Sequence, residues 1–242
     1  MILHNYRVIF VALMMCALFA RADVADTRLL EILERAVSFI DNPDGGPGEV
    51  QYAIELTGND TNRVVSLMKQ LVDEGTKRKG ALRFYISEIG KYGTSSDLPF
   101  LYQKVTTVDY CASATEAILR IEGLTTNSLT QIMSSLPDSP RGNKKSAYAW
   151  CRILDVVTKC PSGEPIRTFA LSNAVQFVSR QTESADWLDR GLIRIEPPYR
   201  MSKRRLAALR SVQSLGVGEW QTNYIAQAIR ELEAYPEANL PE

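Results

Sequence analysis

Two helical patterns separated by a short turn make up residues 79–105, KGALRFYISEIGKYGTSSDLPFLYQKV. In the first half, apolar side chains recur at intervals of three and four residues, the spacing of one face of an α-helix: Leu82, Tyr85, Ile86 and Ile89. A Gly-Thr-Ser-Ser-Asp turn follows, and a second helix is expected over 98–105, where proline is tolerated in the first turn. The stretch therefore predicts two short helices joined by a tight connection.

The same arrangement recurs along the chain. Ile86 and Ile89 are followed 32 residues later by Ile118 and Ile121. Helix pairs that recur at roughly 30–40 residues are typical of stacked helical repeats. Segments that alternate apolar and polar residues, as strands do, are scarce. The expected fold is all-α, an α/α superhelix of antiparallel helix pairs over residues 79–105, 109–136, 144–180 and 202–235.

Short motifs within these pairs resemble HEAT-like repeats. The motifs are Ala81-Leu82-Arg83 with Ile89-Gly90, then Asp97–Leu101, and they are echoed by Ala114 with Ala117–Ile121 and by Ala207–Arg210 with Leu215-Gly216. The resemblance covers residues 77–181 and, less well, 202–232. It implies an α-solenoid whose successive inner helices offer an extended surface to proteins or peptides. The Asp and Arg residues that often orient such repeats are not regularly placed, and the chain resembles no characterised enzyme.

Residues 23–242 are expected to form one such domain. Ahead of the repeats, helices are predicted over 26–41 and 50–56, and from 61 to near Gly75, where Asn59-Asp60-Thr61 offers an N-cap. The apolar positions with helical spacing give the predicted core: Leu82, Ile86, Ile89, Leu101, Ile118, Ile121, Ile132, Leu154, Phe169, Leu209, Val212 and Ile225.

The first 22 residues have the pattern of a secretory signal peptide. Arg7 precedes the 13 uncharged residues Val8–Ala20, which are too few to cross a bilayer as a helix of about 20 residues. Ala20 and Ala22 are small residues suited to a cleavage site. We expect export to the periplasm or the extracellular space after cleavage following Ala22, with no membrane span left. The alternatives are an uncleaved anchor and a buried helix.

Composition excludes several kinds of chemistry. The single histidine, His4, lies in the expected signal peptide, so the mature chain would lack His-dependent catalysis and His-ligated zinc. Cys111, Cys151 and Cys160 alone make a poor metal site, and whether any two of them pair is open. Lys and Arg number 28, as do Asp and Glu, so no excess of positive charge indicates a nucleic-acid partner. We expect neither a metal nor a cofactor.

Residues 182–199, TESADWLDRGLIRIEPPY, break the repeat pattern and are expected to form an irregular insert. Pro197-Pro198 disfavours a helix at that point. The apolar content of the segment is too high for a free linker. Two interpretations remain open: a connection packed on the solenoid, or a flap over a binding groove.

A non-enzymatic adaptor or scaffold that binds a protein or peptide is the leading hypothesis, because helical repeats are present and a catalytic constellation is missing. One alternative is a glycan-acting hydrolase that uses carboxylates near 183–189, where Glu183, Asp186 and Asp189 are spaced for acid–base work. A third possibility is a structural module of an envelope assembly.

Binding is expected where the repeat pattern fails. Aromatic and arginine side chains are enriched at the centres of protein interfaces, and arginine recognises carboxylates. The candidate binding residues are Trp187, Tyr199, Arg200, Lys203, Arg204 and Arg205. The structural alternative places Trp187 in the core and pairs the arginines with Glu231 and Glu233.

Overall fold

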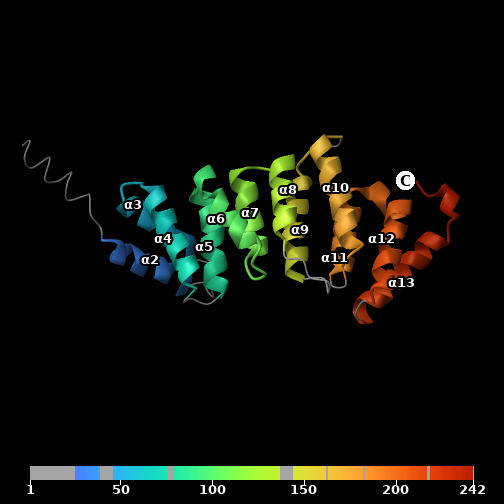
Figure 1. Cartoon of the computed structure of the whole chain (residues 1–242), viewed down its shortest axis with the longest axis horizontal. Coiled ribbons are helices and arrows are strands. Elements are labelled where there is room, and N and C mark those ends of the chain that lie inside the picture. Colours follow the sequence, from blue (N-terminus) through green and yellow to red (C-terminus); the bar gives the residue numbers. More distant parts are fainter. Residues whose placement is uncertain are drawn as a thin grey trace, which may run out of the picture. The chain divides into compact units, whose positions relative to one another are not determined.

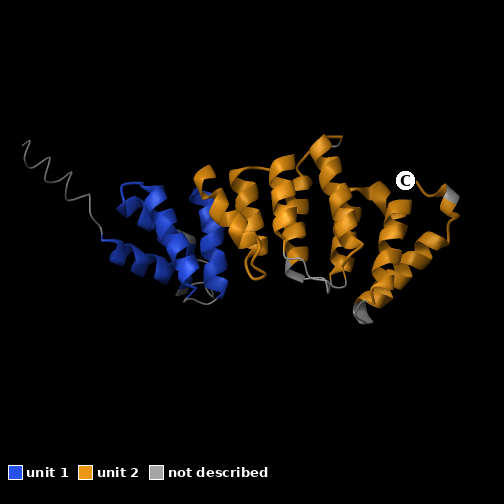
Figure 2. Ribbon diagram, in the orientation of Figure 1, with its two compact units in different colours: residues 1–94 blue, residues 95–242 orange. Residues whose placement is uncertain are grey.

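The structure is a computed structural model that describes residues 25–38, 46–75, 79–136, 144–161, 163–181, 184–216 and 219–241. The predicted signal peptide lies outside these residues. All regular secondary structure in the described ranges is helical, so the all-α prediction is confirmed at that level. None of the helices described there is long and apolar enough to cross a membrane. The chain divides into two compact units, residues 1–94 and 95–242 (Figure 2).

Unit 1 contains four helices: α2 (Asp26–Ser38), α3 (Gly46–Leu56), α4 (Thr61–Glu74) and α5 (Lys79–Tyr92). Helix α2 packs against α3, and α4 packs against α5. The side chain of Asp60 caps α4 by accepting a hydrogen bond from the Arg63 N–H at 3.0 Å. Gly75 ends α4 in the left-handed region at φ 63°, which glycine adopts without strain. The cap residues predicted from the sequence are therefore confirmed.

Unit 2 contains eight α-helices in its described part, with short 3₁₀ turns between some of them. The α-helices are α6 (Leu98–Val105), α7 (Cys111–Ile121), α8 (Thr126–Ser135), α9 (Lys144–Val157), α10 (Pro165–Val178), α11 (Ala185–Ile195), α12 (Lys203–Ser214) and α13 (Glu219–Glu233). The 3₁₀ turns are η1 (Ser95–Asp97), η2 (Pro197–Met201) and η3 (Glu237–Asn239). Eleven of the twelve described α-helices, all but α11, match the expected residue ranges to within four positions at each described end.

Helices of unit 2 contact one another in a regular order. Helix α7 packs on α9, α9 on α11 and α11 on α13, whereas α6 contacts α8, α8 contacts α10 and α10 contacts α12. Figure 1 shows these helices following one another side by side from α6 to α13. Consecutive helices, such as α10 with α11 and α12 with α13, are also in contact. The unit is therefore built from two rows of helices with alternate members of the sequence in each row.

The predicted core is largely confirmed. Ten of its twelve side chains are buried, including Ile86, Ile118 and Val212 with no exposed surface. The prediction was wrong for Ile121 and Phe169, which are only partly buried. Ile121 is the last residue of α7, so its side chain reaches the end of the packed layer. Phe169 lies at the edge of the α10 face that Ala170, Leu171, Ala174 and Val178 bury.

The expectation of an irregular insert over 182–199 was wrong. Residues 185–195 form helix α11, and the residues that follow form the 3₁₀ turn η2. Leu188, Leu192 and Ile195 are buried at intervals of four and three residues, the spacing of one helix face. The two prolines stand one and two positions beyond the C-cap of α11, Glu196, where proline is compatible with the end of a helix. The segment therefore provides a packed helix of the α7–α9–α11–α13 row.

Candidate functional site

A groove of about 480 Å³ lies between α9 and α11. Its lining residues come from one face of each helix: Cys151, Leu154 and Asp155 from α9, and Trp187, Arg190, Gly191, Arg194 and Ile195 from α11. Leu154 and Ile195 are almost fully buried and form an apolar floor. Gly191 faces Leu154, and a Cβ at position 191 would lie 3.6 Å from the Leu154 Cδ1 atom. The missing side chain at Gly191 thus keeps the middle of the groove open.

One end of the α9–α11 groove is aromatic. The Trp187 ring packs against the Tyr148 ring at a centroid distance of 5.8 Å. Trp187 nevertheless remains 47% exposed, which is unusual for the largest side chain and rules out the expected alternative of a core tryptophan. The contacting pairs Tyr148–Trp187 and Asp155–Arg194 are both separated by 39 residues. Because the same interval holds at both ends of the two helices, α9 and α11 run parallel.

The rest of the groove carries more positive than negative charge. Arg194 is 72% exposed and approaches Asp155 at only 3.8 Å. Asp155 is shared with Arg152, again at 3.8 Å. The Arg190 guanidinium lies over the Tyr224 ring at 4.5 Å, a cation–π contact that holds the group without neutralising it. Arg190 has no carboxylate partner within the described ranges, so the groove presents guanidinium groups that can accept a further anion.

A buried polar cluster joins α11 to α12 and α13. Asp189 is fully buried and accepts hydrogen bonds from the Arg205 guanidinium, from Nε at 3.1 Å to each oxygen and from Nη2 at 2.9 Å. The Tyr224 hydroxyl donates to the same carboxylate at 2.7 Å. Arg205 also donates to the Arg200 carbonyl oxygen at 2.9 Å. The cluster therefore ties α11, α12, α13 and the η2 turn together through paired charges that are hidden from solvent.

Burial in this cluster changes the protonation of its tyrosines. Desolvation, reinforced by the charge of Asp189, raises the pKa of Tyr224 to about 12. The same causes hold the pKa of Tyr199 far above its usual value. Burial alone would lower the pKa of Arg205, but the hydrogen bonds and the charge of Asp189 outweigh it and raise this pKa. Both tyrosines are consequently neutral and Arg205 is charged at physiological pH.

The structure separates the six candidate binding residues. Trp187 and Arg200 are exposed, and Lys203 and Arg204 are partly buried. Tyr199 has no exposed surface and Arg205 only 4%, so the prediction that these two contact a partner was wrong. Arg205 is held in the interior as the counter-charge of Asp189, which lies 16 residues before it.

The basic start of α12 is also divided among internal contacts. Arg204 pairs with Glu196 at 2.9 Å. The Lys203 N–H donates to the Pro241 carbonyl oxygen, which brings the C-terminal end back to α12 (Figure 1). Arg210 pairs with Glu233 and Glu237. The structural alternative for the candidate arginines, pairing with Glu231 and Glu233, was therefore wrong for Arg204 and Arg205, which pair with Glu196 and Asp189.

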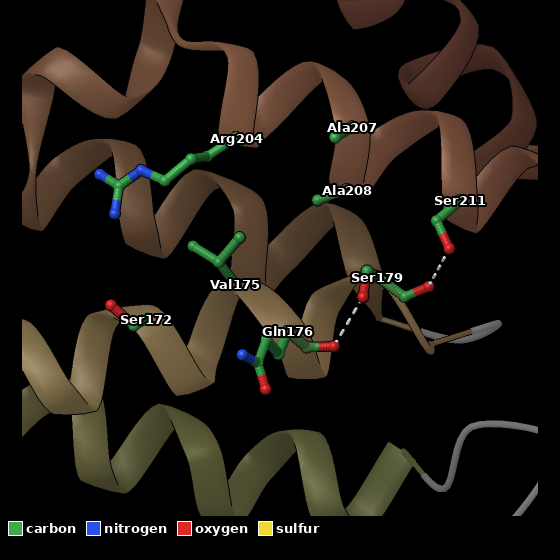
Figure 3. A pocket seen from close by; sticks show the side chains of 8 residues that line it. All are labelled: Ser172, Val175, Gln176, Ser179, Arg204, Ala207, Ala208 and Ser211. Atoms are coloured by element: carbon green, nitrogen blue, oxygen red, sulfur yellow. Dashed lines mark hydrogen bonds between the residues drawn. The ribbon is translucent and has the colours of Figure 1, made fainter. Parts of the chain in front are cut away.

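A second pocket, of about 410 Å³, lies between α10 and α12. Figure 3 shows Ser172, Val175, Gln176 and Ser179 facing Arg204, Ala207, Ala208 and Ser211 across it. The Ser211 hydroxyl donates to the Ser179 carbonyl oxygen at 2.9 Å, and the Ser179 hydroxyl donates to that of Gln176 at 2.7 Å. Because its one charged side chain, Arg204, already has a carboxylate partner, this pocket has less capacity for an anionic ligand than the α9–α11 groove.

Carboxylates near 183–189 do not form an acid–base pair in the described structure. Glu183 lies outside the described residues. Asp186 is partly buried at the start of α11, but Asp189 is enclosed and its oxygens are occupied by Arg205 and Tyr224. A general acid or base has to reach the substrate, either directly or through one water. Asp189 therefore acts as a structural counter-ion in this conformation.

Cysteine and metal chemistry is equally restricted in what the structure describes. Cys111, Cys151 and Cys160 form no disulfide with one another. Cys151 lies in the groove, where burial, reinforced by the charge of Asp155, raises the pKa of its thiol and so disfavours the thiolate. Within the described ranges, no three Cys, His, Asp or Glu side chains gather as metal ligands would.

Sequence reasoning missed Tyr148, Arg190, Gly191, Arg194 and Tyr224. Arg190 and Arg194 are four residues apart, and Trp187 precedes Arg190 by three, so a helical reading of 185–195 puts all three on one side. That reading was available from the apolar spacing of the segment. Tyr148 and Tyr224 carry no local signal, because their contacts to α11 span 39 and 34 residues.

Comparison with known proteins gives no relative for this arrangement: no family model, curated protein or solved structure matches the chain.

Proposed function

We propose that this chain is an exported, non-enzymatic protein of the HEAT-like α-solenoid kind, and that it binds another protein or a peptide through the α9–α11 groove. The observation that carries the proposal is the groove itself. It combines an apolar floor, a half-exposed tryptophan and arginines that lack full neutralisation, the features enriched at the centres of protein interfaces.

Contact spacing in unit 2 supports the repeat assignment. Glu116 of α7 and Arg152 of α9 are 36 residues apart, Tyr148 of α9 and Trp187 of α11 are 39 apart, and Asp189 of α11 and Tyr224 of α13 are 35 apart. Each contact therefore links a helix to the next-but-one helix after an almost constant interval. This is the periodicity of a stack of helix pairs, in which every repeat contacts its neighbours. A single solenoid over residues 23–242 remains part of the proposal.

Export is tested by the mature N-terminus. N-terminal sequencing of protein recovered from the native host is expected to begin at Asp23, because Ala20 and Ala22 suit signal peptidase. Recovery of intact Met1 in the cytoplasmic fraction contradicts this part of the proposal.

Partner binding is tested by filling the groove. Gly191→Gln places a polar side chain over the floor, while Gly80→Gln makes the same change on an exposed face of α5 where nothing lies within 4 Å of the new Cβ. Photo-crosslinking from position 158, an exposed position one turn beyond the groove residues Leu154 and Asp155, is expected to capture a partner in the exported fraction with an otherwise unchanged groove and with Gly80→Gln, and to lose it with Gly191→Gln. Equal capture by all three proteins contradicts a binding role for the groove.

The two other functions considered from the sequence have less support. Asp189 is unavailable for glycan hydrolysis because it is buried and fully hydrogen-bonded. A structural module of an envelope assembly is compatible with the fold, but no feature of the described residues favours it over a binding protein.

A further inference from the structure

We infer that the α9–α11 groove takes an acidic segment of its partner, one in which carboxylates flank an apolar side chain. This inference rests on the proposed binding function and names the chemistry of the occupant. Its basis is the order of groups along the groove: an aromatic end at Trp187, a middle in which Arg190 lies next to the apolar surface of Gly191 and Leu154, and a charged end at Arg194 and Asp155.

The charges that line the groove favour a negatively charged occupant. Two arginines and one aspartate line the groove, and Asp155 divides its carboxylate between Arg194 and Arg152 at 3.8 Å each. Both distances are longer than the 2.7–2.9 Å of a charge-assisted hydrogen bond. An incoming carboxylate can therefore pair with Arg194 at a shorter distance without breaking a tight internal bond. A basic segment would meet repulsion from both guanidinium groups that line the groove.

Arg190 is already positioned for such a contact. The Arg190 guanidinium carbon lies 4.5 Å from the centre of the Tyr224 ring, a cation–π contact that places the group without using its N–H groups on a carboxylate. Arg190 and Arg194 are one helical turn apart, roughly 6 Å along α11. Two carboxylates of one extended segment can span that interval, because side chains on the same face of an extended strand are about 7 Å apart.

The apolar part of the groove explains why the occupant needs an apolar residue as well. Leu154 and Ile195 form the floor, and the Gly191 position leaves space above Leu154 that an aliphatic side chain can fill. The half-exposed Trp187 ring gains further burial when a segment covers it. Burial of apolar area supplies most of the affinity at an interface, while charge pairs supply orientation and specificity.

A peptide fits these features better than a nucleic acid. The chain as a whole has equal numbers of acidic and basic residues, so it lacks the broad positive potential that nucleic-acid binding requires. Asp155 lines the groove beside Arg194, where it would repel a continuous run of phosphates. Discrete carboxylates on a short segment avoid this repulsion.

The test is selection of a random-peptide library on the full-length mature protein, with enriched peptides then measured by fluorescence anisotropy. Enriched sequences are expected to contain two Asp or Glu residues around an apolar residue. Their affinity is expected to fall at least about tenfold with Arg190→Glu/Arg194→Glu, a change of about 1.4 kcal/mol, and to fall with rising salt. Gly80→Gln serves as the matched control, and thermal melting of every variant verifies the fold.

Different outcomes separate this inference from the proposed function. Enriched peptides that lose binding on Gly191→Gln but lack acidic residues, or that tolerate the charge reversal, overturn the inference and leave groove binding standing. Peptides that bind Gly191→Gln as well as wild type overturn the proposed function itself. A fluorescein-labelled single-stranded oligonucleotide that competes with the peptides, and binds more tightly than they do through Arg190 and Arg194, overturns the choice of a peptide.

Discussion

Asp189→Asn should strongly destabilise the second unit of the protein. Asparagine has nearly the same size as aspartate, so the change removes the negative charge without opening a cavity. Arg205 would then keep its positive charge at 4% exposure, with only an amide oxygen and the Arg200 carbonyl to accept its hydrogen bonds. Breaking a buried ion pair by removing one partner costs roughly 3–5 kcal/mol. We expect a loss of about 3 kcal/mol, because the amide can still accept one of the bonds.

Urea denaturation followed by tryptophan fluorescence measures this loss. Trp150, Trp187 and Trp220 are the three tryptophans of the chain, and all belong to residues 95–242, so the signal reports on the unit that contains the pair. A loss of about 3 kcal/mol is a large part of the roughly 5–15 kcal/mol by which most domains are stable. It should therefore move the unfolding midpoint clearly.

A double-mutant cycle separates the pair from the individual side chains. Arg205→Met alone leaves Asp189 buried without its counter-charge and should be as destabilising as Asp189→Asn. The double variant has no buried net charge and should recover at least about 1–2 kcal/mol of the summed loss. Arg204→Met is the matched control: this arginine is partly exposed and paired with Glu196, so its loss should cost less than about 1 kcal/mol. Additive effects at positions 189 and 205, or a loss below about 1 kcal/mol for Asp189→Asn, would refute the reasoning.

Three further predictions use the same denaturation assay. Gly191→Ala should stabilise the protein by about 0.5–1 kcal/mol, because alanine favours a helix interior and its Cβ would meet Leu154 at an ordinary 3.6 Å; destabilisation would mean that α9 and α11 pack more tightly than the structure shows. Trp187→Ala should cost about 1 kcal/mol, well under the roughly 3–5 kcal/mol of a core aromatic, because the ring is 47% exposed; a larger loss would place the ring in the core. Stability should fall as the pH rises above 10, since Tyr199 ionises near 10 when unfolded but stays neutral in the fold. The raised pKa of Tyr199 contributes its full stabilisation below pH 10. Above pH 10 the free energy of unfolding should fall by up to about 1.4 kcal/mol per pH unit. Tyr199→Phe should reduce this slope, and an unchanged slope would contradict the prediction.

Helix positions were predictable from the sequence because helical periodicity is a local property. The pattern over 79–105 gave α5 and α6 within a residue, and Asp60 and Gly75 marked the ends of α4 through capping rules that involve only neighbouring residues. Helix α11 was missed although Leu188, Leu192 and Ile195 carry the same spacing. Pro197-Pro198 led to the prediction of an irregular segment, although prolines directly after a helix only mark its end.

The candidate site was less predictable because burial depends on distant partners. Arg204 and Arg205 are neighbours of the same type, yet one is partly exposed and the other buried. The difference arises from Asp189, which lies 16 residues away on α11, and from Tyr224, which lies 35 residues from Asp189 on α13. A run of basic residues in the sequence indicates charge, but the packing of three helices decides which member is available to a ligand.

Tyr224 links the stability of unit 2 to the proposed groove. The Tyr224 hydroxyl donates to Asp189, and the Tyr224 ring contacts the guanidinium of Arg190, the residue that follows Asp189 on α11. Asp189 and Arg190 thus use the two ends of one tyrosine, the carboxylate in the interior and the guanidinium at the surface. The buried cluster fixes the ring, and the ring contacts the guanidinium of the groove residue Arg190, which has no carboxylate partner among the residues that the structure describes. Substitutions at adjacent positions of α11 should therefore have different consequences: at 189 they act on folding, and at 190 they act on the charge that the groove offers to its partner.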